Sequence, residues 1–189
     1  MNKLIEDTIL DSIRIKKMLL SESDTILQIS ERVSSAYKNG NKVLLCGNGG
    51  SASDAMHVAG ELEGRFLMER RGLPAIVLGT NTAAATAIAN DYGYSSVFCR
   101  ELEACGATGD VLLAFSTSGN SENIVLAVSR AKEMGIFTIG FLGSGGGKLG
   151  PMCDIPIIIN SNTAARVQEC HILIGHIVCD LVEKELFKA

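Results

Sequence analysis

The 189-residue sequence has no apolar run approaching the roughly 18 residues that a membrane span needs. It also has no surplus of positive charge, because 17 lysines and arginines are outnumbered by 21 aspartates and glutamates and no basic stripe occurs. These absences argue against a membrane protein and against direct binding of nucleic acid. Residues 1–20 do not resemble a signal peptide, so a cytoplasmic protein is expected.

No C-x-x-C pair occurs among the six cysteines, and several of them lie within apolar segments. A thiol in such a position behaves as a small buried hydrophobic side chain. The pattern favours free thiols in a reducing compartment over disulfides. Apolar residues make up 47% of the chain, and this surplus indicates contacts between subunits.

Short apolar segments alternate with segments of helical length after residue 40. The predicted strands cover residues 42–46, 75–79, 111–115, 137–142 and 155–159. Most are apolar without alternation, which is typical of a parallel sheet covered by helices on both faces. Apolar residues at helical spacing predict two further helices in residues 2–39. Residues 1–189 are therefore predicted to form one α/β domain, a three-layer αβα sandwich with a five-stranded parallel sheet, preceded by N-terminal helices.

A serine-rich segment follows the third predicted strand. Residues 116–121 read STSGNS, so four hydroxyl side chains stand where a helix is expected to begin. A helix start offers unpaired backbone N–H groups and the positive end of the helix dipole, which together favour a phosphate. A polar turn with one capping serine would explain one hydroxyl but not four. We therefore predict a phosphate site at Ser116, Thr117, Ser118 and Ser121.

Two glycine-rich segments also follow predicted strands. Residues 47–52 (GNGGSA) match a dinucleotide fingerprint, but the next strand ends at residues 79–81 (GTN) with no acidic residue to hold a ribose. We interpret the segment as a turn that lets a ligand approach the backbone, with Asn48 and Ser51 available to sugar hydroxyls; a purely structural turn is the alternative. Residues 143–148 (GSGGGK) depart from a nucleotide P-loop and are expected to form a flexible turn.

Two pairs of polar side chains are predicted to lie on helices. His57 and Glu61 are four residues apart and project from one helix face. Gln168 and His176 are eight residues apart on the last helix, about 80° from each other around its axis. Together these groups could bind a divalent ion such as zinc or carry acid–base chemistry, whereas a surface hydrogen bond is the commoner role of a helical His–Glu pair.

Other polar residues have open roles. Arg65 follows Glu61 by one turn and can either pair with that carboxylate or reach a ligand phosphate. Asn90 and Asp91 end an alanine-rich helical stretch, where an aspartate can simply terminate a helix. His171 is expected to be a packing or interface residue.

These segments together resemble the sugar isomerase (SIS) family, and within it the phosphoheptose isomerases. The resemblance rests on residues 46–57 (CGNGGSASDAMH), Glu61 with Gly64-Arg65, Asn90-Asp91, residues 116–121, and residues 165–171 (ARVQECH) with His176. It covers essentially the whole chain. It implies the SIS fold and conversion of sedoheptulose 7-phosphate to D-glycero-D-manno-heptose 7-phosphate through an enediol. That reaction is the first step toward activated heptose for lipopolysaccharide core or other surface glycans.

The resemblance also implies roles for particular residues. A zinc ion would be held by His57, Glu61, Gln168 and His176, with Glu61 and His176 carrying protons. The four hydroxyl residues of the serine-rich segment would anchor the phosphate. The sugar would be positioned by Asn48, Gly49, Gly50, Ser51, Arg65, Asn90, Asp91 and Gln168. Residues 1–39 would serve mainly to pack a homotetramer whose active sites lie between subunits.

Two departures from the family pattern and two alternative functions remain. Ala165 stands where some members have an acidic residue, and residues 51–53 read SAS instead of SHC. SIS relatives that bind the replication initiator DnaA or sense phosphosugars share the fold without isomerising a substrate, but they tend to lack the glutamate found here at position 61. Another phosphosugar aldose–ketose isomerase is the second alternative.

Overall fold

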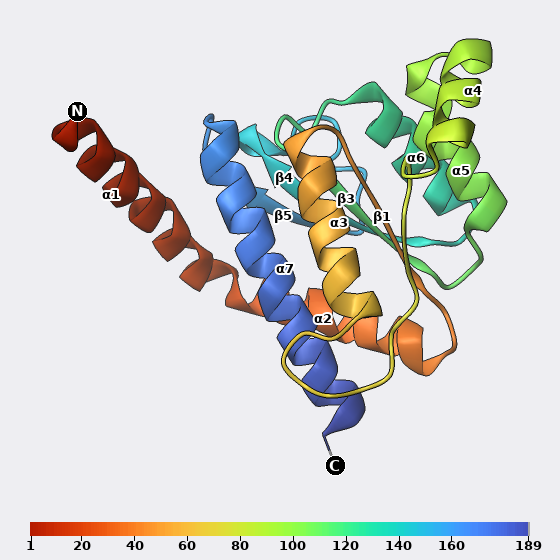
Figure 1. Ribbon diagram of the computed structural model, residues 1–189, viewed down its shortest axis with the longest axis horizontal. Coiled ribbons are helices and arrows are strands. Elements are labelled where there is room, and N and C mark those ends of the chain that lie inside the picture. Colours follow the sequence, from red (N-terminus) through yellow and green to blue (C-terminus); the bar gives the residue numbers. More distant parts are fainter. Residues whose placement is uncertain (189) are drawn as a thin grey trace.

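Five strands form a single parallel sheet at the centre of the molecule (Figure 1). The computed structural model describes residues 1–188, and the strand order is β2-β1-β3-β4-β5. The strands are β1 (Val43–Gly47), β2 (Ala75–Val77), β3 (Val111–Ser116), β4 (Phe137–Gly143) and β5 (Ile155–Ile159). All pairings are parallel, as predicted.

Helices cover both faces of this sheet. One face carries α2 (Ser23–Lys38), α3 (Gly50–Glu63) and α7 (Ala164–Phe187), and the other carries α4 (Thr82–Tyr92), α5 (Val97–Cys105) and α6 (Glu122–Glu133). Successive residues of a strand point to opposite faces, so Leu113 packs with the first group and Leu112 with the second. The central strands β1 and β3 therefore contribute to two apolar cores, which is why residues 43–46 and 111–115 are apolar without alternation. The predicted three-layer sandwich is confirmed.

The carboxyl ends of the inner strands lie level at one edge of the sheet. Gly47 of β1 pairs with Phe115 of β3, and Ser116 pairs with Leu142 of β4. The loops that follow these strands therefore start beside one another. This edge collects the segments in which phosphate and sugar contacts are predicted.

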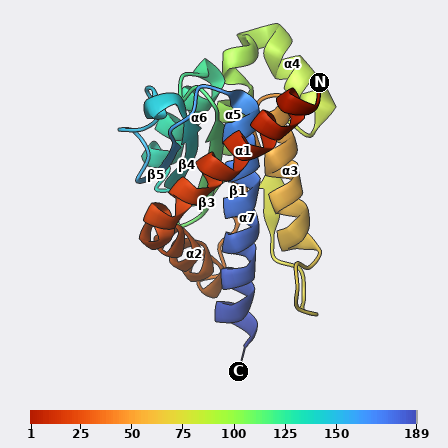
Figure 2. The same cartoon turned by 90° about the vertical axis from the view of Figure 1, so that its left-hand side faces the viewer.

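The N-terminal helices are also confirmed. α1 (Asn2–Met18) leads through a short 3-10 turn, η1 (Leu19–Glu22), into α2. Figure 1 shows the start of α1 projecting away from the rest of the fold, and Figure 2 shows α1 crossing α7. No helix within residues 1–188 combines the length and apolar character that crossing a bilayer requires.

The predicted strand limits hold within one residue except at β2, which is shorter than expected. β2 ends at Val77 because the chain turns at Leu78 and Gly79, where Gly79 has a φ of 87°. This left-handed conformation favours glycine and takes the chain out of the sheet toward α4.

Candidate active site

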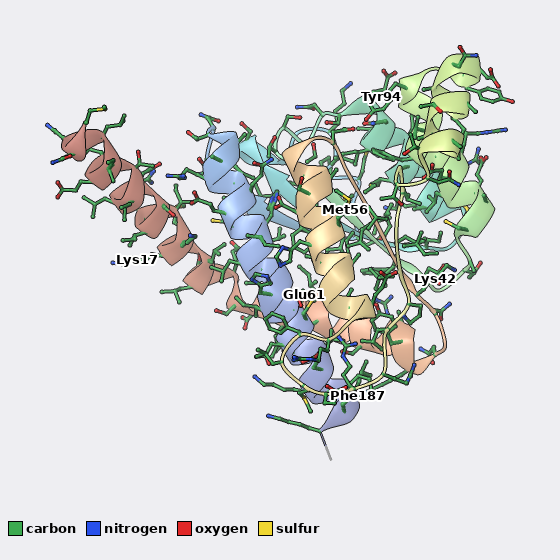
Figure 3. All side chains as sticks on the ribbon, in the orientation of Figure 1. Lys17, Lys42, Met56, Glu61, Tyr94 and Phe187 are labelled. Atoms are coloured by element: carbon green, nitrogen blue, oxygen red, sulfur yellow. The ribbon has the colours of Figure 1, made fainter. Side chains whose placement is uncertain are left out.

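Three side chains from two helices meet where α3 packs beside α7. The Nε2 atoms of His57 on α3 and His176 on α7 are 3.0 Å apart, and Glu61 Oε1 lies 3.2 Å from His57 Nε2. The three ligand atoms all lie within 4.8 Å of one another. Figure 3 shows Glu61 on the side of α3 that faces α7. We call this group the His57–Glu61–His176 cluster.

A glycine makes the close approach of the two helices possible. Gly175 immediately precedes His176, and a Cβ atom at position 175 would lie 2.5 Å from Cγ2 of Val58. A real side chain cannot approach that closely, so a larger residue would push α7 away from α3. Val58 directly follows His57, and the contact therefore lies beside both imidazole rings. The packing of the helices itself brings the rings together.

The cluster has the donor atoms that suit a divalent metal ion. Imidazole nitrogens and carboxylate oxygens are ligands that zinc binds in proteins. Two ring nitrogens 3.0 Å apart can share one proton or a common cation, whereas two protonated rings would repel each other. The side chain of His57 is 49% exposed and that of Glu61 is 26% exposed, so a ligand can reach them. The residues present therefore fit a zinc ion.

Gln168, the fourth predicted metal ligand, lies elsewhere on the same chain. Its side-chain amide packs against Gly50 at the start of α3, so tightly that a Cβ atom at position 50 would overlap the amide nitrogen. Gln168 and His176 are eight residues apart on α7, which is about 12 Å along a helix axis. The structure thus brings three of the four predicted ligands together and places Gln168 toward the carboxyl edge of the sheet.

The serine-rich segment forms the predicted turn into α6. Ser116 ends β3 and Ser121 immediately precedes α6, with their Oγ atoms 3.4 Å apart. The hydroxyl of Ser121 makes no capping hydrogen bond to α6. The backbone N–H of Gly119 donates to Ser116 Oγ over 3.1 Å, which holds the turn in shape. Hydroxyls gathered at the positive end of the α6 dipole form an arrangement suited to a phosphate.

The second glycine-rich segment supports this turn. After β4 the chain forms the 3-10 turn η3 (Ser144–Gly146), and the N–H of Leu149 donates to the carbonyl oxygen of Gly119. Gly119 has a φ of 66°, and a Cβ atom there would overlap the backbone of Gly146. The segment predicted as a flexible turn is therefore packed against the serine-rich turn.

Known phosphoheptose isomerases are similar to this chain over its whole length. The SIS domain family model matches residues 12–143. The phosphoheptose isomerase of Clostridium acetobutylicum is 55% identical over 190 residues, covering 99% of this chain and 97% of the relative. That of Aneurinibacillus thermoaerophilus is 47% identical over 191 residues, covering 100% and 96%. The solved structure of the Neisseria gonorrhoeae phosphoheptose isomerase matches with a TM-score of 0.92 at 38% identity, covering 97% of this chain and 98% of that one.

The chain belongs to the phosphoheptose isomerase family of SIS-domain proteins. The family and the SIS fold expected from the sequence are therefore confirmed, and the protein is an isomerase.

Asn48 of this isomerase is held in place by two other side chains. Its amide exchanges two hydrogen bonds of 2.9 Å with the amide of Asn123, and the hydroxyl of Tyr94 donates to Asn48 Oδ1 over 2.9 Å. Within residues 1–188 the second N–H of the Asn48 amide has no hydrogen-bond partner, so it can donate to a ligand. Ser51, in contrast, is buried in the first turn of α3. The sequence does not point to Tyr94 or Asn123, because no spacing pattern links either residue to Asn48.

Arg65, Asn90 and Asp91 are exposed at the surface of this isomerase. Arg65 pairs with Glu69 over 3.7 Å, and no ion pair within residues 1–188 joins it to Glu61. Asn90 and Asp91 lie in the last turn of α4, where the Asn90 amide donates to the Asp91 carboxylate over 2.9 Å. Their predicted contacts with substrate remain predictions.

Two residues beside the cluster were missed by the sequence analysis. Asp54, one turn before His57, has a buried carboxyl oxygen with no hydrogen-bond partner among the described residues. Burial raises the pKa of this carboxyl to about 6, although nearby His57 lowers it. Phe66 stacks on the ring of His176 with centroids 5.4 Å apart and an angle of 18°. The i,i+3 spacing of Asp54 and His57 could have indicated that Asp54 lies beside the cluster. No pattern in the sequence links Phe66 to His176.

Proposed function

We propose that this protein interconverts sedoheptulose 7-phosphate and D-glycero-D-manno-heptose 7-phosphate, and that Glu61 and His176 move the protons. The similarity to phosphoheptose isomerases supports the reaction. The convergence of Glu61 and His176 within 4.8 Å supports the choice of residues, because one sugar carbonyl can reach both groups.

Moving a carbonyl group from C2 to C1 of the sugar requires a matched set of proton transfers. A base removes a proton from C1 while the C2 oxygen gains a proton, which gives an enediol. A proton is then delivered to C2 while the C1 hydroxyl loses its proton and becomes the aldehyde oxygen. The Glu61 carboxylate is suited to the carbon-bound proton, and the His176 imidazole is suited to exchange with the oxygens. Every proton removed is replaced, so the reaction is a balanced isomerisation.

The phosphate of the substrate would be held by Ser116, Thr117, Ser118 and Ser121. Hydroxyls and the start of α6 bind the phosphate away from the reacting carbons. Such remote binding holds C1 and C2 at the His57–Glu61–His176 cluster and lowers the entropic cost of reaction. Asn48 and the backbone at Gly49 and Gly50 would contact sugar hydroxyls.

Zinc is the proposed metal, held by His57, Glu61 and His176. Bound zinc would stabilise the negative charge that develops on the sugar oxygen. Gln168 of the same chain lies about 12 Å from His176 along α7, so Gln168 of a second copy would complete the predicted ligand set. This distance supports an active site shared between subunits.

A homotetramer is proposed because α1 exposes an apolar face. Ile5, Ile9 and Ile13 repeat every four residues and are all exposed, and Leu4 and Leu10 beside them are exposed too. Further copies of the chain would cover this face. Light scattering should report four chains, and Ile9→Glu should reduce that number. An unchanged tetramer in this variant would exclude α1 from the subunit interface.

We further propose that the product supplies activated heptose for lipopolysaccharide core or other surface glycans, and that the enzyme works in the cytoplasm. All six cysteines are free and four of them are buried, which supports a reducing compartment.

Incubating the protein with sedoheptulose 7-phosphate and measuring the aldose product tests the proposal. Glu61→Gln and His176→Gln should each lower kcat about 100-fold or more, which is the usual loss when a general acid or base is removed. Glu63→Gln is a matched control, since Glu63 is an exposed carboxylate at the end of the same helix.

Near-full activity in both Glu61→Gln and His176→Gln would refute the assignment of these residues. No turnover of any phosphosugar by the unaltered protein would favour the non-catalytic alternative, a SIS protein that binds DnaA or senses a phosphosugar. Turnover of a shorter ketose phosphate only would favour the other isomerase alternative.

A further inference from the structure

The segment of residues 64–74, which joins α3 to β2, is held by one buried carboxylate on α7. Figure 1 shows this segment sweeping past the C-terminal half of α7. Glu183 accepts hydrogen bonds from the backbone N–H groups of Phe66, Leu67 and Met68 over 2.8, 2.9 and 2.8 Å. It also accepts one from Nε of Arg70 over 2.9 Å. The two carboxylate oxygens therefore accept hydrogen bonds from four N–H groups within residues 66–70.

Arg70 connects the same carboxylate to the end of α3. Its Nη1 donates to the carbonyl oxygens of Leu62 and Gly64 over 2.7 and 3.0 Å, and its Nη2 donates to that of Glu61 over 2.7 Å. The last carbonyl groups of a helix have no partner within the helix, and a cation there is favoured by the helix dipole. Arg70 thus ties the final turn of α3 to Glu183 on α7.

This ion pair lies out of contact with water. The side chains of Glu183 and Arg70 are each 1% exposed. Removing two charges from water costs several kcal/mol per ion, and apolar residues of similar size often give equal or greater stability. Stability alone is therefore a weak explanation for this buried ion pair. Its two side chains make at least seven hydrogen bonds, which fix the position of the segment and of the end of α3.

Both ends of this network touch the His57–Glu61–His176 cluster. Phe66, whose N–H is held by Glu183, stacks on the ring of His176. Glu61, whose carbonyl oxygen is held by Arg70, supplies the carboxylate of the cluster. Glu183 lies seven residues after His176, which places both on one face of α7.

We propose that Glu183 and Arg70 are positioning residues for the isomerisation: they fix residues 64–70 so that Phe66 orients the His176 ring and the last turn of α3 orients Glu61. Neither residue touches the reacting atoms. This inference rests on the proposed function, because it takes Glu61 and His176 as the groups that move protons.

Glu183→Gln tests the inference because it keeps the shape of the side chain and removes the charge. An uncharged amide cannot accept all four hydrogen bonds, so the segment should shift. We expect kcat to fall about 10- to 100-fold with little change in KM, the size of loss seen when supporting residues of a site are removed. Phe66→Leu, which leaves the ion pair in place, should lower kcat in the same way.

Asp110→Asn is the matched control. Asp110 is also a carboxylate with a 1% exposed side chain, and it accepts backbone N–H groups from Lys42 and Ala107 and pairs with Lys42 Nζ over 2.6 Å. It lies before β3, at the opposite end of the sheet from the serine-rich turn. Both variants should lose thermal stability, but only Glu183→Gln should lose kcat. Equal kcat in folded Glu183→Gln, Phe66→Leu and Asp110→Asn would overturn the proposal.

A measurement without turnover separates this inference from the proposed function. The ring current of Phe66 should shift the His176 ring resonances in an NMR spectrum of histidine-labelled protein, assigned by their loss in His176→Gln. Glu183→Gln should move these resonances at fixed pH, and Asp110→Asn should not. If they do not move, the inference fails even when Glu61→Gln is inactive. If they move while Glu61→Gln and His176→Gln stay active, the proposed function fails instead.

Discussion

His57 and His176 lie 119 positions apart in the sequence, yet their Nε2 atoms are only 3.0 Å apart. The rings are tilted by 60° with centroids 5.0 Å apart, so each turns the same nitrogen toward the gap between them. Glu61 adds an oxygen to that gap. The two imidazoles can share either a proton or a metal ion, and only a metal ion would be detected as bound zinc.

Protein prepared without a chelator should contain about one zinc per chain, since two imidazoles and a carboxylate bind zinc well. His57→Gln should lose most of this zinc because it removes one of the nitrogen ligands. Zinc binding should weaken in acid, because protons compete with the metal for the ring nitrogens. Metal content by mass spectrometry and zinc titration by calorimetry check these outcomes.

Asp91→Asn is the control for zinc binding, because Asp91 is an exposed carboxylate on α4, away from the cluster. It should bind zinc as the unaltered protein does. Equal zinc content in His57→Gln and Asp91→Asn would show that the cluster does not hold the metal.

The shape of the serine-rich turn should depend on glycine at position 119. Gly119 and Gly145 both have left-handed φ values, 66° and 76°. A Cβ atom at position 119 would overlap Gly146, whereas one at position 145 would meet no described atom within 4 Å. Gly119→Ala should therefore displace the turn and lower kcat/KM roughly 100-fold, the cost of moving a positioning group by about 1 Å. Gly145→Ala should cost only about 1 kcal/mol of backbone strain and keep its activity. Steady-state kinetics with comparable losses in both variants would contradict this account.

Local patterns in the sequence are enough to predict the fold and part of the candidate site. The apolar strands and the STSGNS segment carry their own structural preferences, so the parallel sheet and the turn into α6 follow from them. The spacing of His57 and Glu61 likewise places both on one helix face. These features depend on residues close together in the chain.

Contacts between distant segments could not be predicted in this way. The approach of His176 to His57 depends on how α7 packs against α3, and the position of Gln168 beside Gly50 depends on the same packing. The amide pair of Asn48 and Asn123 joins two loops that no spacing rule connects. Such contacts arise from tertiary packing, and they produce no periodic pattern in the sequence from which they could be predicted.

Acid should destabilise the folded protein partly through His171. This residue is fully buried with its ring edge-on to Phe115 and Phe141, 5.9 Å from each, which confirms a packing role. Burial lowers its pKa from 6.5 to about 4. The unfolded chain therefore binds a proton below pH 6.5 while the folded chain stays neutral down to about pH 4. Above pH 6.5 His171 should not change the free energy of unfolding. As the pH falls from 6.5 to about 4, that free energy should decrease by on the order of 3 kcal/mol.

His171→Leu should remove this contribution and shrink the difference between the urea midpoints at pH 7.5 and pH 4.5. Ile174→Ala is the control, because Ile174 is fully buried on the same helix and cannot titrate. It should lower both midpoints and leave their difference as in the unaltered protein. An equal difference in His171→Leu would show that another group sets the acid sensitivity.

The spacing between α3 and α7 can be tested through Gly175 and Val58. Gly175→Ala places a methyl group 2.5 Å from Val58 Cγ2, so the helices must separate and the His57–Glu61–His176 cluster must widen. Zinc affinity and kcat should both fall, each by about 10- to 100-fold as for other losses of support around a metal site. Val58→Ala combined with Gly175→Ala removes the obstructing methyl group and should recover most of both quantities, a positive coupling that a double-mutant cycle measures. Gly60→Ala should leave both unchanged, because a Cβ atom at position 60 of α3 meets no other atom of residues 1–188 within 4 Å. If Val58→Ala restores neither zinc affinity nor kcat, helix spacing is not what holds the two imidazoles together.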